Sequence, residues 1–175
     1  MALQVSFRVV GIYCYFENLQ LTTVTKDSTV KQVMDAIVAQ NLNFQYTSIP
    51  MGGKPIVTSM SYNYTNQSEK PFNASDPTPG QRSLAMPMDA SLVWQYYRSV
   101  TGTINGAVCE LKLFSQNQPS FADLPLDYND PFFGTLPAGF EVHTYNLTWR
   151  LVRIQMSPTK QAAYMAAHVD ALRAQ

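Results

Sequence analysis

Apolar and polar positions alternate most clearly at the start of the chain. Residues 3–16 form a run rich in Val, Ile, Tyr and Phe, and residues 19–25 alternate between apolar and polar side chains. Both patterns are typical of β-strands. Glu17 and Asn18 separate the two runs and are suited to a turn. The pattern therefore predicts a β-hairpin at the N-terminal end of the chain.

A helix is predicted over residues 29–40. Asp27 and Ser28 precede it, and either side chain can accept hydrogen bonds from the first free backbone amides, as an N-cap residue does. The apolar residues then follow at i, i+3, i+4, i+7 and i+8, the spacing of one helical face: they are Val30, Val33, Met34, Ile37 and Val38.

The middle of the chain predicts two pairs of strands with a long loop between them. The first pair covers residues 44–49 and 56–64 around a turn at 50–55, and the second covers 92–100 and 107–114 around a turn at 101–106. The intervening stretch, residues 66–89, is polar and contains four prolines, which indicates a loop. A loop of this length is uncommon in a compact domain and is often functional.

The last third of the chain predicts a loop, a strand and a helix. Residues 118–139 are rich in proline and aromatic residues, and a long strand follows over 140–156. The apolar parity of this strand changes partway, which a β-bulge near Leu151 or burial on both faces would explain. Pro158 then suits the first position of a helix over 158–173.

Together these elements predict an α+β fold: a mixed sheet with one packed amphipathic helix, long loop insertions and an additional C-terminal helix. The length of 175 residues fits a single domain, 1–175.

Two segments resemble a known fold. Leu19–Ile37, reading LQLTTVTKDSTVKQVMDAI, resembles the second strand and first helix of the β-grasp (ubiquitin-like) domains. Trp94-Gln95-Tyr96-Tyr97, followed by Gly102 and Gly106, resembles the W-x-Y-x segment of the ligand-binding β-grasp branch related to the transcobalamin C-terminal domain.

The resemblance implies a β-grasp-like core over residues 1–114, with residues 115–175 as an elaboration that carries the long strand and the terminal helix. It also implies a ligand pocket near Trp94 and Tyr97. The sequence ends Ala-Leu-Arg-Ala-Gln rather than in the Gly-Gly tail of ubiquitin-like modifiers, so conjugation chemistry is not implied.

Charged residues are scarce and balanced. Lys and Arg number 12, Asp and Glu number 12, and together they make up 14% of the chain, against about a quarter in a typical domain. Near-zero net charge favours association between protein molecules. The absence of a basic run argues against nucleic-acid binding. No segment is apolar enough for a membrane span, and residues 1–8 lack the basic start, apolar run and cleavage site that are typical of a signal peptide. We therefore expect no membrane contact and a cytoplasmic protein.

The residues that could carry chemistry do not form an established motif. His143 and His168 lack metal-ligand spacing, and nothing places a serine as a nucleophile. Asp123, Asp127, Asn129 and Asp130 could offer oxygens to Ca²⁺, but such residues beside proline also suit turns. We expect no enzyme activity, no metal and no cofactor. Whether Cys14 and Cys109 form a disulfide stays open.

The expected function is that of a structural or assembly protein. It would self-associate, or dock to other subunits, through uncharged loops and the terminal helix. The candidate interface residues are Phe132, Phe133, Tyr164, Met165, Val169 and Leu172. The alternatives are a small-ligand-binding β-grasp module, with Trp94 and Tyr97 in its pocket, and a ubiquitin-like adaptor that acts without C-terminal conjugation.

Overall fold

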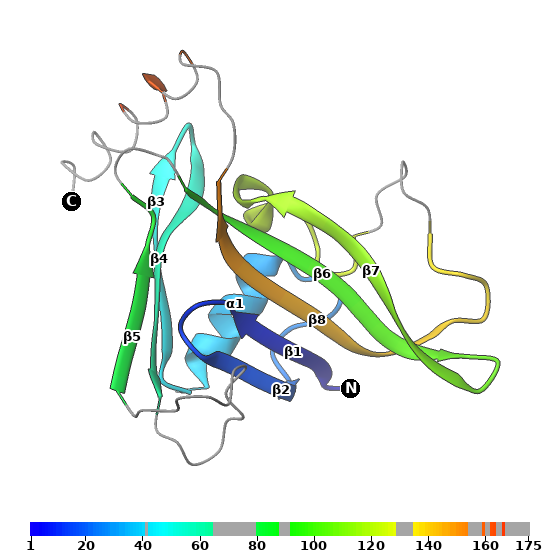
Figure 1. Ribbon diagram of the computed structural model, residues 1–175. Helices are drawn as coiled ribbons and strands as arrows, with labels where there is room; N and C mark the ends of the chain where they lie inside the picture. Colours follow the sequence, from blue (N-terminus) through cyan, green and yellow to red (C-terminus); the bar gives the residue numbers. More distant parts are fainter. Residues whose placement is uncertain are drawn as a thin grey trace.

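A computed structural model gives the fold of the chain. It describes residues 1–40, 42–64, 80–87, 92–128 and 135–153, together with 159, 162, 163 and 166; for residues 64 and 112–119 it describes the backbone alone. The described part holds one α-helix and two β-sheets (Figure 1), which confirms a mixed α+β class built mostly of strands.

The larger sheet contains five strands in the order β2-β1-β8-β6-β7. The strands are β1 (Leu3–Val9), β2 (Cys14–Leu21), β6 (Val93–Ile104), β7 (Ala107–Asn117) and β8 (Glu141–Val152). β1 and β8 run parallel, and every other neighbouring pair runs antiparallel. β8 lies at the centre of this sheet, although the resemblance placed residues 115–175 outside the core.

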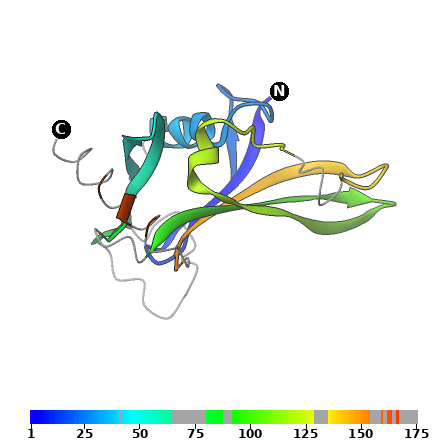
Figure 2. The same ribbon diagram turned by 90° about the horizontal axis from the view of Figure 1, so that it is seen from above.

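The helix α1 (Val30–Ala39) covers one face of this sheet (Figure 2). Thr29 is its N-cap, and not Asp27 or Ser28 as predicted. The Thr29 hydroxyl accepts from the Gln32 amide at 3.2 Å, and the Gln32 side chain accepts from the Thr29 amide at 2.9 Å. This reciprocal capping box satisfies two amides at once, whereas the Ser28 hydroxyl accepts from the Thr25 amide.

The smaller sheet contains three antiparallel strands in the order β3-β4-β5. They are β3 (Phe44–Met51), β4 (Lys54–Tyr64) and β5 (Gly80–Ala85). The turn between β3 and β4 uses Gly52 and Gly53 at positive φ, which suits a two-residue hairpin. The sequence predicted a loop throughout residues 66–89, and the strand β5 shows that this prediction was wrong for residues 80–85. These residues show no apolar alternation of their own, and they form a strand because they pair with β4.

The predicted first hairpin is present, but its turn lies earlier. The chain reverses at residues 10–13, where Gly11 and Tyr13 have φ values of 100° and 57°. Glu17 and Asn18 instead form a β-bulge, because both lie opposite Ser6 in the β1–β2 pairing. Asn18 has a φ of 55°, a conformation that asparagine tolerates better than most residues.

The β6–β8 pairing has no bulge near Leu151, which was one of the two explanations for the change of apolar parity in this strand. Leu151 pairs regularly with Trp94, and the irregularity lies where Thr101 pairs with Thr144 but Gly102 pairs with Val142. In the β6–β7 hairpin, both strands are longer than predicted, and the turn narrows to Asn105 and Gly106 with φ values of 50° and 78°.

The core lies between the two sheets and α1, and it is rich in aromatic side chains. Phe7 and Phe44 join the two sheets at a ring-centroid distance of 4.8 Å, and Phe121 meets Trp149 at 5.6 Å. Phe121 belongs to the 3₁₀-helix η1 (Gln118–Ala122) within the predicted 118–139 loop. The Trp94 indole donates to the Thr58 carbonyl at 3.2 Å, which ties β6 to β4. The predicted terminal helix, 158–173, falls almost entirely outside the described residues.

Candidate functional site

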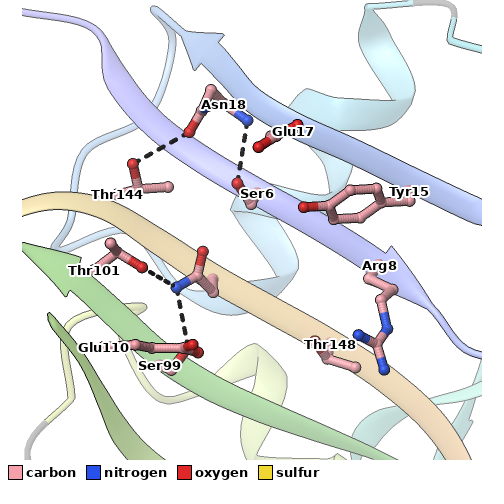
Figure 3. A pocket seen from close by; sticks show the side chains of 11 residues that line it. Ser6, Arg8, Tyr15, Glu17, Asn18, Ser99, Thr101, Glu110, Thr144 and Thr148 are labelled. Atoms are coloured by element: carbon pink, nitrogen blue, oxygen red, sulfur yellow. Dashed lines mark hydrogen bonds between the residues drawn. The ribbon is translucent and has the colours of Figure 1, made fainter. Parts of the chain in front are cut away.

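A polar groove of about 410 Å³ lies on the outer face of the five-stranded sheet (Figure 3). This face is opposite to the one that packs against α1. All five strands contribute to the groove, and each of its eleven lining side chains is polar. They are Ser6 and Arg8 from β1, Tyr15, Glu17 and Asn18 from β2, Ser99 and Thr101 from β6, Glu110 from β7, and Thr144, Asn146 and Thr148 from β8.

Successive side chains of a β-strand point to opposite faces of the sheet, which places these polar side chains on the same outer face. In β1, Val5 and Phe7 are buried in the core, so Ser6 and Arg8 point to the outer face. In β8, Leu147 is buried and its polar neighbours in the strand lie on the groove side. Register then aligns the strands, because Ser6 pairs with Asn146 across the parallel β1–β8 ladder and Asn146 pairs with Ser99.

One hydrogen-bonded cluster lies at the β2 side of the groove. The side-chain nitrogen of Gln4 donates to the side-chain oxygen of Asn18 at 3.0 Å and to the Thr144 hydroxyl at 2.8 Å. The Asn18 backbone amide donates to the Ser6 hydroxyl at 3.1 Å (Figure 3). The Asn18 bulge makes this possible, because it turns an additional residue of β2 toward the outer face.

A second cluster is centred on Asn146 in β8. Its side-chain nitrogen donates to the Ser99 hydroxyl at 3.0 Å and to the Thr101 hydroxyl at 2.9 Å. The Ser99 hydroxyl in turn donates to the Glu110 carboxylate. The orientation of the Asn146 amide is therefore fixed by β6, and Ser99 connects it to a carboxylate on the edge strand β7.

Arg8 marks a third region, between Tyr15 and Thr148 (Figure 3). Burial and the nearby Arg150 lower the pKa of the Arg8 guanidinium, which stays cationic because the pKa of arginine starts far above neutrality. Burial, and then the Glu17 carboxylate, raise the pKa of the Tyr15 hydroxyl. Tyr15 is neutral at pH 7, as an ordinary tyrosine is, and can donate a hydrogen bond.

The groove carries both signs of charge, with one more carboxylate than cation. Arg8 is the one cationic lining residue, and Glu17 and Glu110 are the two carboxylates. The carboxylates come from β2 and β7, the two edge strands of the sheet. Four inter-strand steps separate those edges, which places their backbones about 19 Å apart.

The two residues predicted to line a ligand pocket do not share a face. Trp94 is fully buried in the core, where its indole donates to the Thr58 carbonyl. Tyr97 lies on the outer face, because it is three residues further along the same strand. Its hydroxyl accepts from Arg150 at 2.7 Å, and the Arg150 guanidinium stacks over its ring at 4.2 Å. The predicted pocket between Trp94 and Tyr97 is therefore not formed.

None of the other predicted residues that the structure describes lines the groove. Phe132, Phe133, Tyr164, Met165, Val169 and Leu172 lie outside the described residues. His143 is exposed, and its ring meets the Thr103 hydroxyl at 3.3 Å. Cys14 and Cys109 are not joined by a disulfide.

The two described aspartates of the 123–130 segment, Asp123 and Asp127, form ion pairs with lysines. Lys54 contacts the Asp123 carboxylate, and Lys26 lies 3.4 Å from Asp127. Asn129 and Asp130 fall outside the described residues. Among the residues that are described, no three His, Cys, Asp or Glu side chains gather as they would around a metal ion.

Sequence reasoning missed the groove, although a signal for it was present. Polar residues occupy every second position in Ser6-Phe7-Arg8 and in Thr144–Thr148, as expected for the outer row of half-buried strands. The strand order was not readable, so nothing showed that these rows adjoin. Asn146 also belongs to a glycosylation sequon, but its amide nitrogen is used within the groove.

Within the described part of the chain, no helix has the length and apolar character needed to cross a membrane. Comparisons of the chain with models of known protein families, with curated proteins and with solved structures found no match. The function is therefore argued from the groove itself.

Proposed function

We propose that the chain is a non-catalytic binding protein that holds a small polar ligand on the outer face of its five-stranded sheet. The observation that carries this proposal is the groove, with eleven polar lining residues from five strands. Its volume falls within the range of about 300–1,000 Å³ for small-molecule sites. An all-polar lining offers little hydrophobic gain, so the ligand must supply hydrogen-bonding groups of its own.

We infer a non-catalytic role from the positions of the two carboxylates of the groove. Carboxylate pairs that act together on one glycosidic bond lie about 5–9.5 Å apart. Glu17 and Glu110 instead come from opposite edges of the sheet, and Glu110 accepts a hydrogen bond from Ser99. This arrangement suits contacts with two ends of a ligand better than attack on one bond.

We further infer a β-grasp core, to which β3–β5 are an addition. Support comes from the order of the elements, because a hairpin leads into a capped helix that packs on a mixed sheet. The ligand site of this proposal differs from the one implied by the transcobalamin-related branch, since Trp94 belongs to the core.

Thermal unfolding in the presence of small polar compounds tests the binding proposal. We would screen saccharides, polyols, amino acids, nucleosides and carboxylic acids against the wild-type protein and two variants. Asn146→Ala removes the central amide of the groove, and Asn63→Ala makes the same change at an exposed position of β4. A ligand that raises the unfolding temperature of wild type and Asn63→Ala, but not of Asn146→Ala, would support the proposal. A flat response over the whole panel would contradict it.

A second candidate is the assembly function expected from the composition. The balanced charge favours association, and the edge strand β7 carries Val108 with 73% of its surface exposed. An exposed edge can pair with a strand of another chain, which would also suit an adaptor that docks without conjugation. Size-exclusion chromatography with light scattering tests self-association. A strict monomer at high concentration would exclude the self-assembling form of this candidate.

A further inference from the structure

We propose that the ligand of the groove is a neutral, hydroxyl-rich compound of the saccharide class. This inference rests on the proposed binding function and names the chemistry that the groove selects. Three features carry it: the hydrogen-bond donors and acceptors that the lining side chains still offer, the presence of both signs of charge, and the fixed orientation of the Asn146 amide.

The second cluster, centred on Asn146, offers hydrogen-bond acceptors to a ligand in the groove. Both hydrogens of the Asn146 amide nitrogen are directed at hydroxyls, Ser99 at 3.0 Å and Thr101 at 2.9 Å. The Asn146 carbonyl oxygen is therefore the part of that amide left to accept from a ligand. Glu110 adds a second acceptor, because Ser99 donates to one of its two carboxylate oxygens.

Hydroxyl groups beside these acceptors provide donors. The Ser6 oxygen already accepts from the Asn18 amide at 3.1 Å, and the Thr101 oxygen accepts from Asn146, so the hydrogen of each hydroxyl is available to another partner. Tyr15 is protonated at pH 7, as an ordinary tyrosine is, and Thr148 lies beside Arg8 on the neighbouring strand. Donors and acceptors thus alternate over short distances.

A ligand rich in hydroxyls matches such a surface best, because each hydroxyl both donates and accepts. A ligand with only acceptors would leave Asn146 and Glu110 unmatched, and one with only donors would leave Ser6 and Thr101 unmatched. Covering a polar group without giving it a partner is costly. The Tyr15 ring, half-buried at the side of the groove, adds an aromatic surface for the C–H face of a sugar ring.

The charges of the groove favour a neutral ligand. Glu17 and Glu110 together repel an anion, while Arg8 repels a cation at its end of the groove. A neutral hydroxyl can contact either kind of residue, since it donates to a carboxylate and accepts from a guanidinium. The internal hydrogen bonds also hold Asn146 and Asn18 in place before binding, which lowers the entropy lost when a ligand arrives.

A charge series on one sugar ring tests this inference. Glucose, glucosamine and glucuronate share a ring but are neutral, cationic and anionic at pH 7, and galactose, mannose, N-acetylglucosamine and maltose extend the neutral set. Saturation-transfer NMR would rank their binding to wild type, Asn146→Ala and Asn63→Ala. We expect at least one neutral sugar to bind more tightly than both charged compounds, and its affinity to fall about tenfold in Asn146→Ala and to stay unchanged in Asn63→Ala.

Three results would overturn the inference, and they are distinguishable. Tighter binding of a charged compound, lost in Asn146→Ala, would exclude the neutral class and leave the proposed binding function intact. The same holds if no neutral sugar binds while another member of the thermal-unfolding panel binds through Asn146. If no compound of either panel binds, the proposed function fails together with this inference. Ser6→Ala serves as a second groove variant should Asn146→Ala not fold.

Discussion

At the residue scale, Arg98 of β6 is a charged side chain that lies in the interior with only 2% of its surface exposed. Its guanidinium donates to the Pro125 and Leu126 carbonyls at 3.0 and 3.2 Å, and it lies over the rings of Tyr96 and Tyr128. These contacts fasten the segment after η1 to the inner face of the sheet.

Replacing Arg98 by methionine is expected to lower the free energy of unfolding by about 2–4 kcal/mol. The substitution keeps most of the apolar volume but leaves two carbonyl groups without their charged donor. Urea unfolding followed by circular dichroism measures the change. Arg150→Met is the matched control, because Arg150 is exposed on the outer face and should cost about 1 kcal/mol or less. Equal stability of the two variants would contradict this role for Arg98.

Four tyrosines predict an alkaline limit to stability. Burial is the main cause that raises the pKa of Tyr15, Tyr46, Tyr96 and Tyr145 above the ordinary value of 10.0. Hydrogen bonds to Asp35 and Asp127 add to the effect at Tyr46 and Tyr145. The folded protein therefore keeps protons that the unfolded chain loses above pH 10, so the free energy of unfolding falls as pH rises past that value.

Urea unfolding at a series of pH values from 8 to 11 checks this prediction. Stability should decline beyond pH 10, and Tyr145→Phe should make the decline shallower, because phenylalanine has no proton to lose. A decline of the same slope in the Tyr145→Phe protein would contradict the assignment to Tyr145.

At the scale of elements, the sequence predicted the helix and the hairpin whose own residue patterns agree with the structure around them. α1 combines an apolar face with a cap, and Asn105-Gly106 is a strong hairpin signal, so both elements were predicted in type. β5 could not be predicted, because none of its residues is fully buried and only its pairing with β4 defines it. The bulges at Asn18 and beside Gly102 show the same limit, since a bulge depends on the partner strand.

The bulge between β6 and β8 depends on Gly102. A Cβ atom at this buried position would overlap the Glu141 carbonyl oxygen and approach the Phe140 ring to 2.9 Å. Gly102→Ala is therefore expected to destabilise the protein by about 2–4 kcal/mol, because backbone atoms cannot give way as a flexible side chain can. Thr103→Ala, one residue further along β6, should cost less than about 1 kcal/mol. Chemical denaturation compares the two, and a Gly102→Ala protein as stable as wild type would contradict the close approach.

At the scale of the whole molecule, the groove depends on strands from both ends of the chain. β1 and β8 are neighbours although about 140 residues separate them in the sequence, and Asn146 is paired with Ser6 on one side and with Ser99 on the other. The sequence could therefore predict that Ser6, Ser99 and Asn146 face away from the core, but not that they face one another. The predicted pair Trp94 and Tyr97 failed for a simpler reason, since residues three apart on a regular strand point to opposite faces.

Mapping the backbone amide shifts of the ¹⁵N-labelled protein in the presence of the neutral sugars tests the central claim most directly. If the outer face is the binding site, the largest shifts will fall on β1, β8 and β6 around Ser6, Asn146 and Ser99. They will disappear in Asn146→Ala and persist in Asn63→Ala. Shifts that gather on the three-stranded sheet or at the edge of β7, with the groove residues unchanged, would contradict the claim.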